Sequence, residues 1–162
     1  MKVSIIKLER DDLSSVARAY MNKDDKAFIA ADKITPVEGY EDFLIHGQPD
    51  RVEHQTTSGT WVEYSPEEFA EVLKRDPGYK GGNIRLLSCK SGLLDDGFAQ
   101  RLSDIMNVKV LAPSEILWIN NDGELFISDN PTLAEMWNNG EKVNPTGKWR
   151  EFTPRGKEDA DE

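Results

Sequence analysis

Hydrophobic and polar positions form blocks along the chain that predict alternating strands and helices. Short runs in which nearly every position is apolar predict strands over residues 26–34, 42–47, 83–89 and 108–113. Continuous runs of this kind are typical of strands that are buried on both faces of a sheet. Two other segments carry a turn signal between apolar stretches, which predicts β-hairpins over residues 55–65 and 115–128.

Helical periodicity lies between these strands, and one helix has a clear start signal. Ser65 is a favourable N-cap, and Pro66 suits the first helical position. Glu68 stands three positions after Ser65, where its side chain can return to the Ser65 amide and complete a capping box. This helix is predicted over residues 65–78, and further helices are predicted over residues 11–20, 95–107 and 130–140.

The order of these elements predicts an α/β fold with a mostly parallel central sheet, helices on both faces and peripheral β-hairpins. The chain has 162 residues, a length typical of one domain. We predict that this domain covers residues 25–154 and follows an N-terminal extension, residues 1–24, with one short helix. Residues 155–162 are charged and acidic, which predicts a disordered tail.

Composition and charge argue against several classes of function. The net charge is −10, which disfavours binding to nucleic-acid phosphates and docking to an anionic membrane surface. No apolar run approaches the roughly 20 residues that span a bilayer, so membrane insertion is not expected. The first residues become charged too early for a signal peptide. We expect a protein that is cytoplasmic where it is synthesised, or an effector that is secreted without a cleavable signal.

Two residues capable of proton and thiol chemistry stand at the ends of predicted strands. His46 lies at the end of one apolar run, and Cys89, the only cysteine, ends the next strand of the sheet. Ligands of parallel α/β sheets bind outside the carboxyl ends of the strands, and neighbouring strand ends lie about 5 Å apart. A thiol reacts as the thiolate, and a nearby imidazole can accept its proton. The pattern predicts a catalytic pair of His46 and Cys89.

Gly47 supports this hypothesis because glycine has no side chain. Without a Cβ, it allows a substrate carbonyl to approach its backbone N–H, which could act as an oxyanion donor. A purely structural interpretation stays open beside the catalytic one. A lone cysteine at the end of a core strand is usually a small buried hydrophobe, and a His-Gly step is often only a turn.

Five residues near the predicted strand ends are candidates for substrate binding. Trp61 follows the histidine loop on a predicted hairpin and is the aromatic candidate for a substrate wall. The other candidates are Asp50, Ser88, Ser91 and Asp95. The carboxylates could select a basic group or orient the histidine, and the hydroxyls could donate hydrogen bonds. Solvated surface acids and ordinary turn residues are the alternative interpretation.

Other polar residues suggest structural roles. Asp95 or Asp96 is predicted to cap the helix over residues 95–107. His54 lies in a polar hairpin and is predicted to be exposed. Two histidines and one cysteine, without the spacing of a zinc motif, predict no metal site, and we expect no cofactor.

The order of apolar strand, His-Gly, capped helix, apolar strand and Cys resembles the caspase-like (clan CD-type) cysteine peptidases. The similarity covers residues 27–113. The segments "FLIHGQPD" and "RLLSC", with the helix that begins "GFAQ", look like C-terminal toxin and effector domains of bacterial polymorphic toxins. The self-cleaving cysteine protease domains of large bacterial toxins belong to the same clan.

This resemblance implies a three-layer caspase-like sandwich and a cysteine-dependent hydrolase, a peptidase that acts as a bacterial toxin, effector or processing domain. His46 would be the general base or thiolate partner and Cys89 the nucleophile, with the amides of Gly47 and Cys89 holding the oxyanion. The substrate would be a protein or peptide, and a toxin would have a cognate immunity or inhibitor protein. Two alternatives stay open: a non-catalytic binding or scaffold module on the same fold, and a Cys-His deamidase or acyl transferase.

Overall fold

The structure is a computed structural model, and it describes residues 10–12, 17–21, 25–56 and 58–155. Most of the predicted acidic tail, from residue 156 onwards, lies outside the described residues. The same is true of much of the predicted N-terminal extension.

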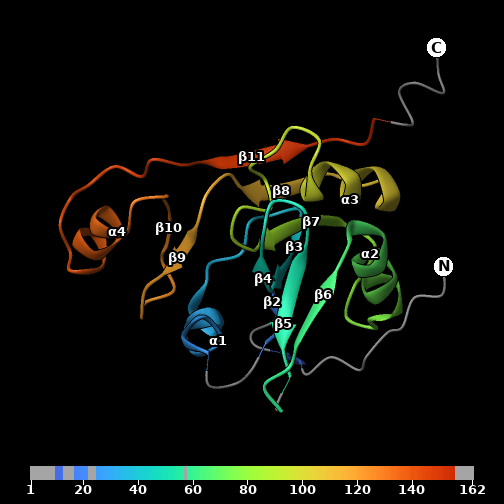
Figure 1. The fold of residues 1–162 in the computed structure, drawn as a ribbon, viewed down its shortest axis with the longest axis horizontal. Helices are drawn as coiled ribbons and strands as arrows, with labels where there is room; N and C mark the ends of the chain where they lie inside the picture. Colours follow the sequence, from blue (N-terminus) through green and yellow to red (C-terminus); the bar gives the residue numbers. More distant parts are fainter. Residues whose placement is uncertain (1–9, 13–16, 22–24, 57, 156–162) are drawn as a thin grey trace.

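A six-stranded sheet forms the centre of the fold, in the order β1-β2-β3-β7-β8-β11 (Figure 1). Its strands are β1 (Arg10–Asp12), β2 (Ala17–Tyr20), β3 (Tyr40–Leu44), β7 (Asn83–Leu87), β8 (Val110–Pro113) and β11 (Trp149–Phe152). The four inner strands run parallel to one another, whereas β1 and β11 pair antiparallel at the two edges. The predicted α/β fold with a mostly parallel sheet is therefore confirmed.

Alternate side chains of the inner strands enter two separate hydrophobic clusters. Phe43 and Leu86 belong to a cluster that contains the apolar faces of helices α2 and α3. Leu44 and Leu87, the next residues along the two strands, belong to a second cluster with α1, η1 and a β-hairpin. These elements are α1 (Lys26–Ala30), the 3-10 helix η1 (Ala31–Lys33), α2 (Pro66–Arg75), α3 (Phe98–Met106), β9 (Leu117–Ile119) and β10 (Leu125–Ile127). Because successive strand side chains point to opposite faces, each cluster covers one face of the sheet.

A buried ion pair fixes the alignment of β3 with β7. Asp42 and Arg85 are register partners in these parallel strands, and both are buried. Two guanidinium nitrogens of Arg85 donate to the two carboxylate oxygens of Asp42 at 2.8 and 2.6 Å. Arg85 also donates to the carbonyl of Thr35 at 3.0 Å. A change of register would leave each charge buried without its partner, which is strongly unfavourable.

Helix α2 begins as the sequence predicts. The Ser65 hydroxyl accepts a hydrogen bond from the Glu68 N–H at 3.1 Å, and the Glu68 carboxylate accepts one from the Ser65 N–H at 3.0 Å. Both halves of the capping box are present, and Pro66 occupies the first turn. This local signal is strong enough to predict the start of the helix to the residue.

Helix α3 begins differently, and the predicted aspartate cap is wrong. Its N-cap is Gly97, and no side chain caps the first turn. The Asp95 carboxylate pairs instead with Arg150 at 2.6 Å, and the Asp96 carboxylate pairs with Arg155 at 2.8 Å. Ion pairs with arginines from distant segments therefore take the place of capping.

The strand predicted over residues 26–34 is also wrong, because this segment forms α1 and η1. Asp25 is the N-cap of α1, and its Oδ1 accepts a hydrogen bond from the Ala27 N–H at 2.9 Å. Satisfying this backbone donor stabilises the first helical turn. The apolar residues of the segment pack on the sheet from a helix instead of from a strand.

The helix predicted over residues 11–20 is wrong where the structure describes it. Residues 17–20 form β2, which pairs in parallel with β3. Ala19 and Tyr20 are buried, so tertiary packing overrides the helical spacing of this segment. The predicted N-terminal extension, residues 1–24, thus contributes two strands to the sheet.

Two small antiparallel sheets lie beside the main one (Figure 1). One contains β4 (His46–Gly47), β5 (Val52–Gln55) and β6 (Trp61–Tyr64), and the other contains β9 and β10. The last helix is α4 (Pro131–Asn138). Both predicted hairpins and the short helix near residues 130–140 are confirmed. The apolar run over residues 42–47 divides, because the main-sheet strand ends at Leu44 and His46 starts the small sheet.

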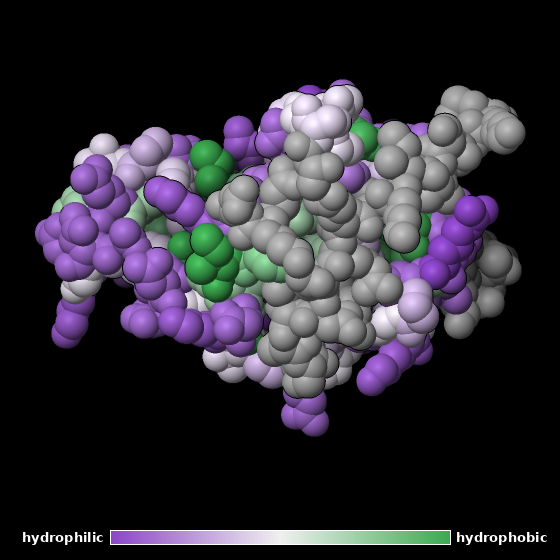
Figure 2. Space-filling model, turned by 90° about the horizontal axis from the view of Figure 1, so that it is seen from below, coloured by the Kyte–Doolittle hydropathy of each residue, from purple (hydrophilic) through white to green (hydrophobic). Residues whose placement is uncertain are grey.

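In the part of the surface that is coloured in Figure 2, the strongly hydrophobic residues form separate patches. Among the described residues, none of the helices has both the length and the apolar character needed to cross a bilayer.

The buried Asp42–Arg85 pair leads to a prediction about stability. Asp42→Leu leaves the Arg85 charge buried without a partner and should lower the free energy of unfolding by about 3–5 kcal/mol. The double variant Asp42→Leu with Arg85→Met removes both charges and should recover most of that loss. Urea unfolding followed by circular dichroism measures both values. A double variant as unstable as the single one would contradict this role of the pair.

Candidate functional site

The register of β3 and β7 brings His46 and Cys89 to the same edge of the main sheet. Leu44 and Leu87 are the last register partners of these strands, and His46 and Cys89 each follow two residues later. The pairing continues one step beyond the strands, since the Ile45 N–H donates to the Leu87 carbonyl at 3.3 Å. The two predicted catalytic residues therefore leave the sheet side by side.

Gly47 lies directly against the segment that carries the cysteine. A Cβ atom on Gly47 would lie 2.1 Å from Oγ of Ser88 and 2.6 Å from the carbonyl oxygen of Cys89. Both distances are far inside van der Waals contact, so a side chain would force these groups apart. Glycine is what allows β4 to contact residues 88–89.

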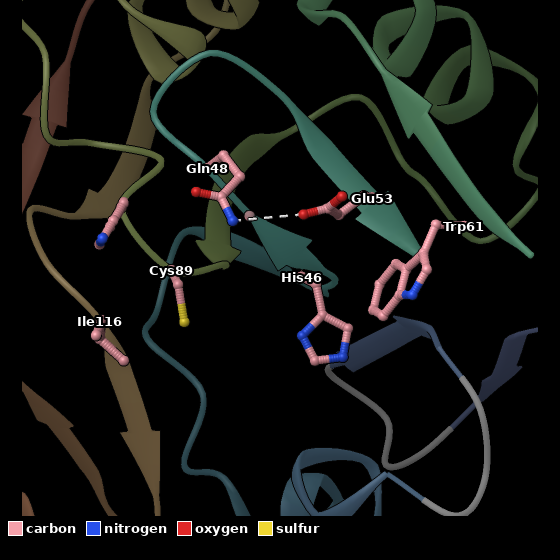
Figure 3. Close-up of a pocket in the computed structure, with 8 residues that line it drawn as sticks. His46, Gln48, Glu53, Trp61, Cys89 and Ile116 are labelled. Carbon is pink, nitrogen blue, oxygen red and sulfur yellow. Dashed lines mark hydrogen bonds between the residues drawn. The ribbon is translucent and has the colours of Figure 1, made fainter. Parts of the chain in front are cut away.

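A pocket of about 350 Å³ opens at this edge (Figure 3). Its lining residues are His46, Gly47, Gln48, Glu53, Trp61, Cys89, Lys90 and Ile116. In the view of Figure 3, Ile116, Cys89, His46 and Trp61 follow one another across the pocket. The pocket thus unites a thiol, an imidazole and an aromatic ring.

Asp25 holds the imidazole in place. Its Oδ2 lies 2.5 Å from Nε2 of His46, while its Oδ1 caps α1. One carboxylate therefore anchors both the helix and the histidine. Because Nε2 donates its proton to the Asp25 carboxylate, Nδ1 is the ring nitrogen that can accept a further proton.

The contact between Asp25 and His46 shifts the pKa of both side chains. The hydrogen bond from Asp25 raises the pKa of His46, against the lowering effect of burial, and the charges of Asp25 and Glu53 add to the rise. The same hydrogen bond lowers the pKa of Asp25. At neutral pH, His46 is therefore protonated more often than a free histidine side chain.

The sulfur of Cys89 is partly buried between the pocket and β9. The Leu117 N–H points at Sγ, with a distance of 3.4 Å between nitrogen and sulfur, and the Leu117 carbonyl oxygen lies 3.8 Å away. Burial raises the pKa of the thiol, whereas the Leu117 N–H and the Lys90 charge act in the opposite direction with smaller effect. The neutral thiol therefore predominates at neutral pH, and its reaction needs a base.

Lys90, directly after the cysteine, has a left-handed backbone conformation with φ 59°. Among the described residues, the other non-glycine with positive φ is Asn107, an ordinary left-handed C-cap of α3. The Lys90 N–H donates to the Glu115 carbonyl at 2.9 Å, which holds the turn. Backbone conformations of this kind are uncommon for non-glycine residues and cluster at functional sites.

Trp61 is the predicted substrate-binding residue that reaches the pocket. Its side chain is half exposed, and its ring meets the His46 ring nearly edge-on, with the centroids 5.7 Å apart. Both residues belong to the small sheet, on β6 and β4. A substrate group in the pocket could pack against the Trp61 ring beside the imidazole.

The other four predicted substrate-binding residues do not line the pocket. Asp50 is exposed and pairs with the adjacent Arg51, and Asp95 is exposed in its pair with an arginine of β11. Ser88 and Ser91 are buried. Ser91 donates to the Ser88 carbonyl at 2.8 Å, which stabilises the turn after β7.

The prediction that His54 is exposed is wrong. His54 is buried, its ring stacks on Tyr64 with the centroids 5.8 Å apart, and Nε2 lies 3.2 Å from the Tyr64 hydroxyl. Alternate residues of β5 point toward the core, and His54 occupies one of these positions. It therefore has a structural role in the small sheet.

Sequence reasoning missed Asp25, Gln48, Glu53, Lys90 and Ile116 as residues of the site. A signal existed for Asp25, since an aspartate before an alanine-rich segment is an N-cap pattern. Its contact with His46, by contrast, depends on how α1 packs on the sheet. In the described part of the chain, no three His, Cys, Asp or Glu side chains are grouped so that they could hold a metal ion.

The Asp25–His46 contact predicts how the histidine titrates. Asp25→Asn should lower the pKa of His46, because the carboxylate charge is lost, while asparagine can still cap α1. NMR titration of the ring protons measures this directly, since the chain has two histidines. Asp32→Asn, on the exposed side of η1, removes the same charge without a contact to His46 and is the control. An unchanged pKa in Asp25→Asn would contradict the assignment.

The same pKa shifts define the pH range in which the contact between Asp25 and His46 stabilises the fold. The raised pKa of His46 stabilises the fold below about pH 6.5, and this contribution is lost as pH rises through the folded-state pKa. The lowered pKa of Asp25 contributes above about pH 3.9 and is lost at lower pH. The stability difference between the wild-type protein and Asp25→Asn should therefore be largest between these values. If the stability difference between the wild-type protein and Asp25→Asn grows above pH 8, this assignment is contradicted.

The segment of the chain that matches a known protein family contains the whole site. A family model described as "Domain of unknown function (DUF8616)" matches residues 16–127. This range contains Asp25 and all the residues that line the pocket, and it ends before α4 and β11. No curated protein and no solved structure matches the chain significantly. Since the match extends over most of its length, the chain belongs to the DUF8616 family.

Proposed function

We propose that this chain is a cysteine-dependent hydrolase, a peptidase in which Cys89 is the nucleophile and His46 the general base. One observation carries the proposal: His46 and Cys89 line the same pocket, and Asp25 holds His46 through Nε2. An acid that orients a histidine beside a nucleophile recurs in unrelated hydrolases. Asp25 is a positioning residue, because it acts through His46.

The first half of the proposed reaction breaks the C–N bond of the substrate. Nδ1 of His46 takes the proton from Sγ of Cys89, and the sulfur attacks the carbonyl carbon to form a C–S bond. When the tetrahedral intermediate collapses, the proton on Nδ1 passes to the leaving nitrogen, and the amine departs. Asp25 keeps the proton on Nε2 throughout and stabilises the positive imidazolium.

The second half releases the acyl group. His46 takes a proton from water, and the hydroxide attacks the thioester carbon. The C–S bond then breaks, and the sulfur recovers its proton from His46, so the products are a carboxylic acid and the original thiol. The N–H groups of Gly47 and Cys89 would hold the oxyanion in both halves. The Cys89 N–H suits this role because it belongs to the residue whose sulfur attacks the carbonyl, and Gly47 contacts the same segment, residues 88–89.

We extend the proposal to the caspase-like clan that the sequence resembles. Support comes from the adjacent parallel strands β3 and β7, with a histidine after one and a cysteine after the other. Hydrophobic clusters on both faces of the sheet suit the three-layer sandwich of that clan. In this proposal the enzyme is a bacterial toxin, effector or processing domain. Its substrate is a protein or peptide, and a toxin of this type would have a cognate immunity or inhibitor protein.

A non-catalytic binding module is the second candidate, and one observation favours it. The Cys89 sulfur is partly buried and contacts the backbone of Leu117. A structural cysteine would make the same contact. In that case, replacing Cys89 would change the stability of the protein and no chemical reaction.

Incubation of the protein with a peptide library derived from a whole proteome distinguishes a peptidase from a binding module. The wild-type protein should generate new peptide N-termini, and Cys89→Ala and His46→Ala should generate none, because each lacks one partner of the proton transfer. Asp25→Asn should be slower by about a hundredfold, since the imidazole loses its orientation. Mass spectrometry of the peptides is the measurement.

Other outcomes of this experiment point to the alternatives. Glutamine or asparagine residues that gain about one mass unit, without new termini, would indicate deamidation by the same two residues. Identical peptides with the wild-type protein and with both variants would contradict the enzymatic proposal and leave the binding module.

A further inference from the structure

A carboxylate, Glu53, and a half-exposed aromatic ring, Trp61, line the pocket together with His46. Glu53 and His46 are register partners on β5 and β4, so their side chains leave the same face of the small sheet. Trp61, on β6, is half exposed and contacts the His46 ring. Figure 3 shows Trp61 on the side of His46 away from Cys89, and the Glu53 carboxylate turned toward Gln48.

Glu53 has no positively charged partner among the described lysines and arginines. The nearest polar contact is the Gln48 amide, which donates to it at 3.5 Å, a long distance for a hydrogen bond. The neighbouring acids differ in this respect, because Asp25 is engaged by His46 and Glu63 pairs with Arg51 at 2.5 Å. When His46 is neutral, as the proposed reaction requires, this half-buried carboxylate has no counter-charge and is a favourable place for a cation.

The proposed reaction defines which part of a substrate would lie there. Cys89 keeps the acyl group, whereas His46 delivers a proton to the leaving nitrogen, so the leaving group must lie beside His46. Glu53 and Trp61 occupy this end of the pocket. Lys90, the cation among the lining residues, directly follows Cys89 along the chain, the residue that keeps the acyl group in the proposed reaction. A cationic leaving group would therefore lie away from Lys90 and against Glu53.

We propose that Glu53 and Trp61 form a subsite for a cationic group on the leaving-group side of the cleaved bond. Preferred substrates then carry arginine or lysine within the first two residues after that bond. This inference rests on the proposed peptidase function. A charge-assisted hydrogen bond to Glu53 and a cation–π contact with Trp61 would both favour the cation. The net charge of −10 would also attract basic substrates.

Matched peptides that differ by one charge test this subsite. A sequence that the wild-type protein cleaves in the library is synthesised with arginine, or with its uncharged analogue citrulline, directly after the cleaved bond. We expect kcat/KM to be about tenfold higher for the arginine peptide, as one partly exposed charged contact would give. Raising the salt concentration should reduce this ratio, because exposed charges are screened.

Variants test whether Glu53 and Trp61 cause the preference for the arginine peptide over the citrulline peptide. Glu53→Gln should reduce the arginine-to-citrulline ratio to about one, and Trp61→Leu should reduce it in part. Glu63→Gln removes the same charge from the adjacent strand, outside the pocket lining, and should keep the full ratio. Glu53 also raises the pKa of His46, but comparing two peptides on the same variant cancels an effect on the base.

The outcomes separate the subsite from the enzyme. Equal cleavage of both peptides by the wild-type protein would overturn the subsite and leave the peptidase intact. A tenfold ratio that persists in Glu53→Gln would also overturn it. If the library shows no cleavage that depends on Cys89, the proposed function fails, and the subsite fails with it.

Discussion

The parallel register of β3 and β7 is the constraint on which the candidate site depends. Asp42 and Arg85 are buried partners in this register, with two hydrogen bonds between them. A shift by one residue would separate the charges and would turn every side chain of the strand to the opposite face. In the observed register both strands end at the same level, and this brings His46 and Cys89 to one edge. A structural ion pair within the sheet thus determines the geometry of the pocket.

A second constraint connects the histidine to the N-terminal part of the chain. Asp25 caps α1 and also holds Nε2 of His46, so the position of the helix and the orientation of the imidazole depend on one carboxylate. The thiol has a raised pKa because it is partly buried. The pocket therefore suits a neutral thiol that gives its proton to a histidine during reaction better than a preformed ion pair. Glu53 and Lys90, which line the same pocket, carry opposite charges.

The sequence predicts those elements whose signals are local. The capping box of α2, the two hairpins and the buried strands β7 and β8 all have patterns that packing does not change. The segment over residues 26–34 is apolar enough for a strand, and only the cap at Asp25 distinguishes it as a helix. The contact of Asp25 with His46 follows from tertiary packing and has no pattern in the sequence. Asp50 and Asp95 stand close to the site along the chain, but arginines at the surface bind them, and sequence distance cannot reveal that.

The pH dependence of Cys89 alkylation tests the partnership of His46 and Cys89 most directly, and the single cysteine makes the rate unambiguous. Iodoacetamide provides the electrophile, and mass spectrometry provides the rate at each pH. The account predicts that the rate rises through the raised pKa of His46, where the imidazole becomes a base, and that His46→Ala loses this rise. A rate that rises only through the pKa of the thiol itself, with the same profile in His46→Ala, would contradict it.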